Sequence, residues 1–352
     1  MSDTITVLAS PNIALVKYWG KRGDGSLNLP NNSSVSVTLD ANALGTKTSV
    51  AIAPELMNDT VYVNGELQAA SRENEKASLL SKIMGEMKRM AGVNDSLLVV
   101  SNNYFPTGSG LASSASGAAA LIYALDGLFN LKMNERELSI MARQVSGSAC
   151  RSVMGGFVRW HKGELDDGSD SYAEQIAPHS HWDIVDMIGI VSETRKKVSS
   201  SEGHSATMRT SSLYAARPAF AEANAAGATA AILGRDFGSL AEIVMRDSNN
   251  MHATMLDTWP HIRYMNDKSW EIVDAVHELN DSSGEAIAAY TFDAGPNAHV
   301  ITTKKHADEV GKVLFETLGA DGKVIRAPVG TGPKRLVDAE SLITDDSAGH
   351  PE

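Results

Sequence analysis

The most distinctive segment of the sequence is the glycine- and serine-rich stretch at residues 106–117. It reads Pro-Thr-Gly-Ser-Gly-Leu-Ala-Ser-Ser-Ala-Ser-Gly and leads into an alanine-rich stretch. Glycine allows close approach of the backbone to a ligand, and free N–H groups at a helix start attract anions. The segment therefore fits a phosphate cradle, and it fits equally a loop that lets a helix pack closely on a sheet. It lacks the Gly-Lys-Ser/Thr ending of a Walker A loop and the third glycine of a dinucleotide fingerprint.

A second segment, residues 10–22, places cationic side chains inside an apolar run. It reads Ser-Pro-Asn-Ile-Ala-Leu-Val-Lys-Tyr-Trp-Gly-Lys-Arg, which puts Lys17, Lys21 and Arg22 among aliphatic and aromatic residues. A lysine in such a setting either extends along the apolar surface toward water or faces an anion. Solvated lysines on the edge of a strand are an equally simple interpretation, and the segment alone leaves both open.

Two further segments carry single charged residues in suggestive surroundings. Arg151 ends the run Ser-Gly-Ser-Ala-Cys-Arg, where neighbouring hydroxyls and a guanidinium suit a phosphate or carboxylate; the alternative is an arginine that caps a helix. Asp293 follows an apolar run and precedes the turn Ala-Gly-Pro. A carboxylate at such a place suits general acid or base catalysis, and the ordinary alternative is an aspartate that hydrogen-bonds its own turn.

The composition limits the partners that these side chains can serve. The chain has 352 residues, and 31 Lys and Arg stand against 43 Asp and Glu, for a formal net charge of -12. Nucleic acid binding requires clustered cations, so no nucleic acid partner is expected, whereas a small anion held by a few local cations is compatible with this charge. The single cysteine, Cys150, excludes an intrachain disulfide, and the histidines lack the spacing of a catalytic zinc pair. No leader pattern or apolar run of about 18 residues is present, so we expect a cytoplasmic protein without a membrane partner.

The hydrophobic pattern predicts the elements that would position these residues. Segregated strands and helices predict an α+β fold, and the length suggests two domains that meet near residue 185. The polar stretch Asp345–Glu352 is expected to be a frayed tail. Strands are predicted near 4–8, 35–39, 46–52, 60–63, 97–101, 157–161, 183–191, 286–292, 299–303 and 323–327, and helices near 75–90, 112–128, 134–146, 205–225, 237–256, 267–279 and 306–318.

Taken together, these segments resemble the motifs of mevalonate diphosphate decarboxylases, a family within the GHMP small-molecule kinase superfamily. The motifs occur in the family's order, and the resemblance extends over residues 5–335, almost the whole chain. It is carried by residues 12–22, 29–39, 106–117, 146–152, 247–257 and 290–297.

The resemblance implies a GHMP-kinase-type two-lobed α+β fold with a deep cleft between the lobes. The N-terminal half would be ribosomal-protein-S5-domain-2-like and the C-terminal half ferredoxin-like. Residues 1–185 would form the ATP-binding domain, 186–338 the C-terminal domain and 339–352 a polar tail. The family uses ATP and Mg²⁺ to phosphorylate the 3-hydroxyl of mevalonate 5-diphosphate. Phosphate and CO₂ then leave, which gives isopentenyl diphosphate for isoprenoid biosynthesis, and a homodimer is a further expectation from the family.

The resemblance also implies roles for particular residues. Asp293 would be the catalytic carboxylate, Lys17 would stabilise the reacting phosphoryl group, and Arg151 would hold the substrate carboxylate. Asn12 would hydrogen-bond near the reacting centre. No metal ligand is identified, because the phosphates supply much of the Mg²⁺ shell. The implied substrate-binding residues are Tyr18, Lys21, Ser146, Ser148, Arg151, Ser200 and Gly203, and the implied nucleotide-binding residues are Ser101, Asn103, Gly108, Gly110, Ser113 and Ser114.

The sequence departs from the family pattern at residues 199–204. Here Ser-Ser-Ser-Glu-Gly-His stands where the family has approximately Ser-Ser-x-x-Gly-Met, and some bacterial relatives have arginine at the position of Ser201. A carboxylate at Glu202 would repel a diphosphate, so the 5-phosphate and the 3,5-bisphosphate of mevalonate are alternative substrates. A mevalonate 3-kinase is a further alternative. A non-catalytic metabolite-binding protein on this fold is the alternative of a different class, and the intact Asp293 argues against it.

Overall fold

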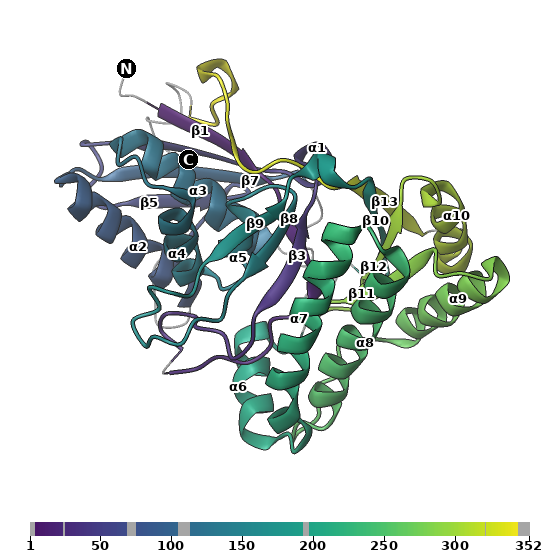
Figure 1. The fold of residues 1–352 in the computed structure, drawn as a ribbon. Coiled ribbons are helices and arrows are strands. Elements are labelled where there is room, and N and C mark those ends of the chain that lie inside the picture. The colour runs from purple at the N-terminus through teal and green to yellow at the C-terminus, as the bar shows by residue number, and fades with distance from the viewer. Residues whose placement is uncertain are drawn as a thin grey trace.

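In the computed structural model the chain forms two lobes that lie side by side (Figure 1). The structure describes residues 4–23, 25–68, 75–104, 113–192, 197–320 and 322–343. Within these residues the strands form three β-sheets, and helices pack on the sheet faces. This arrangement confirms the α+β class predicted from the hydrophobic pattern.

The N-terminal lobe is built on a six-stranded sheet that helices α2, α3 and α4 cover on one face (Figure 1). The side chains of strand β1 alternate between its two faces: Ile5 and Val7 enter the core, whereas Thr6 hydrogen-bonds Ser49 on β4. Neighbouring strands are antiparallel except β5 and β7. The sheet order is β14 (Lys334–Arg335), β1 (Thr4–Ala9), β4 (Thr46–Ile52), β7 (Leu97–Asn103), β5 (Thr60–Val63) and β6 (Glu66–Leu67), and the helices are α2 (Glu75–Ala91), α3 (Ser113–Phe129) and α4 (Glu135–Val145).

A four-stranded sheet lies where the lobes meet, and its two faces differ chemically. On one face, Asn12 and Ser34 hydrogen-bond residues of the short helix α5 (Ala149–Ser152). On the other face, Ile13 and Val35 join an apolar cluster with helices of the C-terminal lobe. The sheet therefore carries polar functional groups on a support that is buried from behind. Its strands are β2 (Asn12–Val16), β3 (Ser34–Thr38), β8 (Phe157–Trp160) and β9 (Ala173–Ala177).

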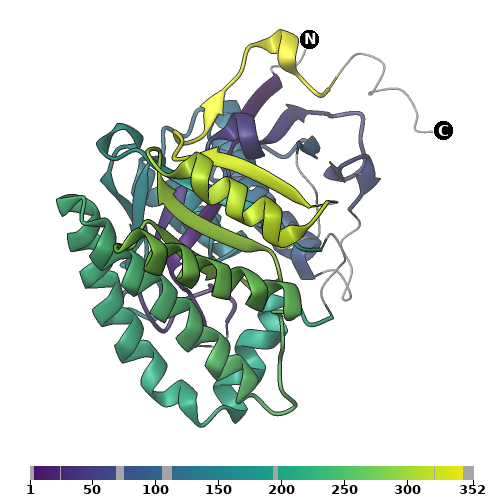
Figure 2. The ribbon, with the colours of Figure 1, turned by 90° about the vertical axis from the view of Figure 1, so that its right-hand side faces the viewer.

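The C-terminal lobe is built on a second four-stranded sheet, with helices on both faces. Helices α9 and α10 cover one face and lie in front of the strands in Figure 2. The opposite face shares the apolar cluster of β2 and β3 with α7 and α8. The strands are β11 (Ala288–Phe292), β12 (Ala298–Thr303), β10 (Ile184–Ile190) and β13 (Lys323–Pro328), and the helices are α7 (Arg217–Gly234), α8 (Phe237–Leu256), α9 (Asp267–Ser283) and α10 (Ala307–Leu318).

The end of the described chain returns to the N-terminal lobe. Strand β14 pairs with β1, and the Leu342 N–H donates to Ser49 Oγ at 2.8 Å. The chain therefore passes from the N-terminal lobe into the C-terminal lobe and back again. The two lobes also share one apolar cluster. The division into domains at residues 185 and 338 stays a prediction.

Most predicted elements are present, and β4, β5 and α8 have the bounds predicted for them. The helix predicted over 205–225 is wrong as a single element. It is divided into α6 (Ser200–Thr210), a 3₁₀ turn over Leu213–Ala216 and α7, which begins at Arg217 with Pro218 in its first turn. Proline is tolerated there but would interrupt a continuous helix. The short elements β2, α1 (Ala41–Leu44), α5, β9, β14 and the 3₁₀ turns over His179–His181 and Asp338–Glu340 were not predicted.

Candidate active site

The centre of the site is an ion pair between Lys17 and Asp293. Lys17 follows the last residue of β2, Asp293 follows the last residue of β11, and the distance from Nζ to Oδ1 is 2.7 Å. The lysine side chain is 2% exposed and the aspartate side chain 32%. The lysine is therefore enclosed, while the carboxylate keeps an open side toward an incoming ligand.

The surroundings of Asp293 favour its ionised form. Burial raises the pKa of this carboxyl, but the charges of Lys17, His299 and Arg151 and the hydrogen bond from Lys17 together lower the pKa below its ordinary value. His299 is itself held by Asp186, with 2.6 Å between Nδ1 and Oδ2. Asp293 is thus a carboxylate at neutral pH, with one side held by a cation, as a residue that accepts or orients a hydroxyl proton requires.

Arg151 is a buried cation that no protein carboxylate neutralises among the described residues. Its Nε donates to Asn12 Oδ1 at 3.0 Å, and its Nη1 donates to Ser34 Oγ at 2.8 Å. The Asn12 amide is oriented in turn by the Ser152 hydroxyl and the Ser148 carbonyl, at 2.8 and 3.0 Å. Burying an unpaired charge is costly, so this arrangement fits a site that a ligand anion completes.

The residues predicted to bind substrate phosphates line the neighbourhood of Arg151 and Lys17. Tyr18 contacts Gly147, where an added Cβ would lie 2.7 Å from the Tyr18 ring, and its buried hydroxyl has no hydrogen-bond partner in the described chain. Burial, as the largest cause, raises the pKa of the Tyr18 phenol well above its ordinary value, so the hydroxyl remains a donor. Ser146 and Ser148 are half-buried on either side of Gly147. An unsatisfied donor beside a buried cation again indicates an anion site.

Helix α6 approaches the same segment from the C-terminal lobe. The Lys21 ammonium donates to Ser201 Oγ at 3.3 Å, next to the half-buried Ser200 at the start of the helix. Gly203 lies so close to Trp19 that an added Cβ would be only 2.8 Å from the indole ring. The His204 ring packs on Trp19 with centroids 4.2 Å apart, and its Nδ1 accepts the Gly20 N–H at 3.0 Å.

The exposed Glu202 takes part in the start of α6. Its carboxylate accepts the Ser199 N–H at 2.8 Å, and its own N–H donates to Ser199 Oγ at 3.2 Å. These two bonds form a capping box that begins α6. The glutamate therefore serves the helix start, where a negative charge is also favourable to the helix dipole.

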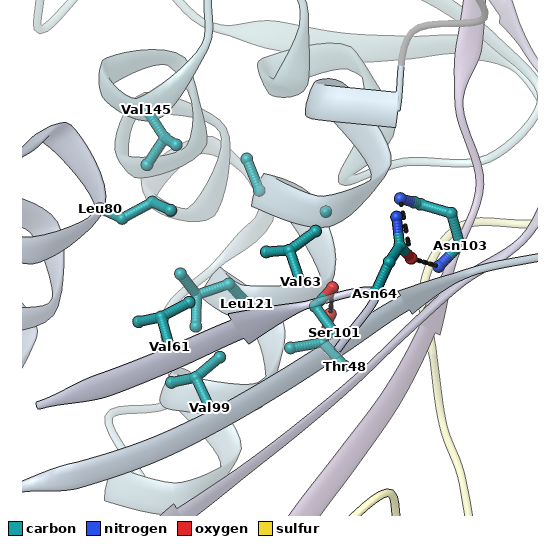
Figure 3. A pocket seen from close by; sticks show the side chains of 12 residues that line it. Thr48, Val61, Val63, Asn64, Leu80, Val99, Ser101, Asn103, Leu121 and Val145 are labelled. Carbon is teal, nitrogen blue, oxygen red and sulfur yellow. Dashed lines mark hydrogen bonds between the residues drawn. The ribbon is translucent and has the colours of Figure 1, made fainter. Parts of the chain in front are cut away.

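The residues predicted to bind the nucleotide gather at a different place, between the six-stranded sheet and helices α2 and α3. Ser101 and Asn103, at the end of β7, line a cavity of about 140 Å³ with apolar walls that include Val61, Leu80 and Leu121 (Figure 3). Ser114 is half-buried in the first turn of α3, which also supplies Gly117 to the cavity. Gly108, Gly110 and the Ser113 side chain lie outside the described residues.

Other predictions concern metals, the cysteine and membranes. In the described part of the chain no group of three or more His, Cys, Asp or Glu could hold a metal ion. Burial raises the pKa of the Cys150 thiol to about 12, which favours a packing role over a nucleophile. None of the described helices combines the length and the apolar character needed to cross a membrane.

Two residues near Lys17 carry contacts that sequence reasoning missed. Asp247 and Arg217 form a fully buried ion pair at 2.8 Å, and both hydrogen-bond the main chain of Lys17. Asp247 begins a motif that the family resemblance includes, whereas nothing in the sequence around Arg217 distinguishes it from a surface arginine.

Comparison with protein families matches the chain in two parts. A model described as the diphosphomevalonate decarboxylase-like N-terminal domain matches residues 9–173, and one described as the mevalonate 5-diphosphate decarboxylase C-terminal domain matches residues 186–342. The diphosphomevalonate decarboxylase of Aspergillus fumigatus is 45% identical over 336 residues, which cover 92% of this chain and 82% of the relative. That of Saccharomyces cerevisiae is 42% identical over 332 residues, which cover 90% and 82%.

Solved structures agree with this assignment. The mevalonate diphosphate decarboxylase from Trypanosoma brucei is similar with a TM-score of 0.88 and 33% identity, over 97% of this chain and 100% of that one. A structure described as MDDEF in complex with MVAPP, AMPPCP and magnesium is similar with a TM-score of 0.84 and 33% identity, over 95% and 98%. These likenesses confirm the two-lobed GHMP-kinase-type fold. The chain belongs to the diphosphomevalonate decarboxylase family.

Proposed function

We propose that this protein converts mevalonate 5-diphosphate and ATP into isopentenyl diphosphate, ADP, phosphate and CO₂. The observation that carries the proposal is the meeting of the Lys17–Asp293 pair with Arg151, a buried cation that no described carboxylate neutralises. The charges of Arg151 and Asp293 are close enough to influence one another. A substrate with both a hydroxyl and a carboxylate matches this pair of groups.

The first step would transfer the γ-phosphoryl group of ATP to the substrate 3-hydroxyl. Asp293 would orient the hydroxyl and accept its proton as the new O–P bond forms and the bond to ADP breaks. Lys17, enclosed beside Asp293, would stabilise the negative charge of the transferring group. Mg²⁺ would neutralise phosphate charge in this step, and the ATP phosphates would supply much of its coordination shell.

The second step would remove the new phosphate together with CO₂. The C–O bond at C3 breaks as phosphate leaves, positive charge grows at C3, and the electrons of the bond to the carboxyl carbon form the alkene. Arg151, oriented by Asn12 and Ser34, would hold the carboxylate so that this bond is aligned. The buried, hydrogen-bonded guanidinium is rigid enough for such a task.

The remaining predicted residues would bind the two phosphate-bearing ends of the reactants. The 5-diphosphate would be held by Tyr18, Lys21, Ser146, Ser148 and the start of α6 at Ser200 and Gly203. The nucleotide base would occupy the cavity at Ser101 and Asn103, and Gly108, Gly110, Ser113 and Ser114 would bind its phosphates. We further propose a cytoplasmic homodimer, by analogy with the family.

The proposal is tested by offering ATP and Mg²⁺ with mevalonate, its 5-phosphate, its 5-diphosphate and its 3,5-bisphosphate in turn. ADP and CO₂ are quantified together, and Asp293→Asn serves as the background. We expect equal amounts of ADP and CO₂ with the 5-diphosphate alone. ADP without CO₂ from every substrate would instead identify a 3-kinase, and CO₂ from the bisphosphate without ATP would identify a decarboxylase of that compound. Nucleotide binding without any turnover would point to a non-catalytic protein.

A further inference from the structure

The main chain of Lys17 is held at both of its polar groups by side chains. Its N–H donates to Asp247 Oδ2 at 2.7 Å. Its carbonyl accepts from Arg217 Nη2 at 3.1 Å and from Asn32 Nδ2 at 3.0 Å. Both groups of a residue beside the reacting centre are thus fixed by contacts that are remote in sequence.

The two charged residues come from the other lobe and form one closed unit. Arg217 begins α7, Asp247 lies within α8, and the guanidinium meets the carboxylate with distances of 2.8 and 2.9 Å between the two pairs of atoms. Both side chains are fully buried. Asn224 and Asn250 donate to and accept from the pair, at 3.1 Å each. The C-terminal lobe therefore positions a residue that the N-terminal lobe contributes.

The local backbone explains why Lys17 needs this support. The pairing of β2 with β3 shifts register between Ala14 and Val16, and β2 ends at Val16. Beyond a bulge the strand ladder no longer satisfies the main-chain groups, which must find other partners when buried. A buried ion pair contributes little net stability compared with apolar side chains of similar size. The hydrogen bonds that the Arg217–Asp247 pair makes to the Lys17 main chain therefore explain the presence of the pair better than a gain in stability does.

We propose that the Arg217–Asp247 pair is a positioning device that holds the Lys17 main chain where its ammonium reaches Asp293. Neither residue touches the substrate in this proposal, which rests on the proposed function for its kinetic consequence. The device acts through the acceptor that Asp247 offers to the Lys17 N–H and the donor that Arg217 offers to the carbonyl. Removing these contacts lets Lys17 move away from Asp293. The attraction between the ammonium and the carboxylate, which keeps Asp293 ionised, then becomes weaker.

Two uncharged double variants separate this role from stability. Arg217→Met with Asp247→Asn removes both charges but keeps an acceptor for the Lys17 N–H. Arg217→Met with Asp247→Leu removes the charges and the acceptor, with side chains of similar size. We expect kcat to fall about 10- to 100-fold more in the leucine variant, since a shift of about 1 Å costs up to about 100-fold. KM for both substrates should change little, because the variant residues contact neither.

The pKa of the Asp293 carboxyl gives a readout that needs no turnover. It is measured by ¹³C NMR titration in the complete chain, where the other titratable or charged groups that interact with Asp293 are His299, Arg151 and His252. We expect the pKa to rise most in the leucine variant and less in the asparagine variant, which keeps the acceptor for the Lys17 N–H but has lost the Arg217 donor, with matching shifts of the acid limb of kcat. If wild-type turnover fails on every substrate, the proposed function is wrong, and this titration still decides the positioning role.

A matched control exists in the N-terminal lobe. Asp59 likewise binds a cation, Lys88, and a strand N–H, that of Leu97, each at 2.9 Å, at the end of β7 opposite to Ser101 and Asn103. Lys88→Met with Asp59→Leu should leave kcat and the Asp293 pKa unmoved. Equal kcat and an unmoved Asp293 pKa in the two Asp247 variants would overturn the proposal. If both double variants fail to fold, Arg217→Lys, which keeps the charge but loses the planar fork, must show the lower kcat and raised pKa, and wild-type values would reject it.

Discussion

The charged part of the site and the cavity proposed for the nucleotide base are built in opposite ways. The cavity has largely apolar walls, and its lining comes from one lobe and from elements with regular hydrophobic patterns (Figure 3). The charged part joins Lys17 to Asp293, which are 276 positions apart in sequence and belong to different lobes. The first is a product of local packing, whereas the second depends on how the lobes meet. Substitutions in the two parts should therefore affect different kinetic constants.

Asp293→Asn gives the largest expected effect and tests the charged part alone. The amide keeps the shape but cannot accept a proton, so we expect kcat to fall about 10²- to 10⁴-fold. Nucleotide affinity, measured by calorimetry, should remain at the wild-type value because Asp293 does not line the cavity. Turnover near the wild-type rate would remove Asp293 from its proposed role, and a parallel loss of nucleotide affinity would contradict the separation of the two parts.

Arg151→Gln should give the second largest effect. Loss of one member of a buried charge contact costs about 2–5 kcal/mol, which corresponds to a fall of about 30- to 5,000-fold in kcat/KM for the phosphorylated substrate. CO₂ release should suffer more than ADP formation, since Arg151 is proposed to align the carboxylate. The ratio of the two products in a single-turnover assay measures this difference.

Arg143 provides the matched control for Arg151. It is equally buried, but its hydrogen bonds go to the main-chain carbonyls of Leu27, Gly168 and Ser171. Arg143→Gln should lower the melting temperature and leave the ratio of CO₂ to ADP unchanged. An altered ratio in this variant, or an unaltered one in Arg151→Gln, would show that burial alone explains the effect.

The same contrast explains what the sequence could predict. Strands such as β4 and β5 and helix α8 followed from hydrophobic period, because one buried face dictates the spacing of their residues. Ser101 and Asn103 lie beside one cavity since they belong to one such strand. Asp293 and Arg151 could be nominated from local patterns, but their roles came from the family resemblance and not from spacing.

Long-range contacts account for what the sequence did not predict. The sequence was equally compatible with Lys17 as a solvated lysine on a strand edge. The residue is buried because β2 packs against α7 and α8 of the other lobe. The Arg217–Asp247 pair could not be predicted from residue spacing, because its geometry depends on how two helices pack against a strand from the other lobe. The capping role of Glu202 was not predicted, because a capping box can only be distinguished from a ligand contact once the helix start is known.

Gly117→Leu tests the cavity side of the comparison and should have a smaller effect. A Cβ at Gly117 would meet nothing within 4 Å, and the residue lines the cavity, so a leucine there has room to enter the space proposed for the base. We expect KM for ATP to rise about 10-fold, as for a loss of about 1.4 kcal/mol, with kcat unchanged at saturation. Gly85→Leu, at an exposed position of α2 that lies outside this cavity, makes the same change and should leave KM unaltered.

The smallest expected effect concerns His252, a neutral group on the charged side. Burial, as the main cause, lowers the pKa of its imidazole to about 4; the charges of Lys17 and Arg217 act in the same direction, and the hydrogen bond to the Phe292 carbonyl and the charge of Asp293 act against it. Between about pH 6.5 and 4 the unfolded chain binds a proton here that the folded chain refuses, so falling pH removes about 3 kcal/mol of the free energy of unfolding. His252→Gln should flatten that slope in denaturant titrations. An unaltered slope in His252→Gln would mean that folding does not lower the imidazole pKa, so that the charged part of the site gains one more cation already below about pH 6.5.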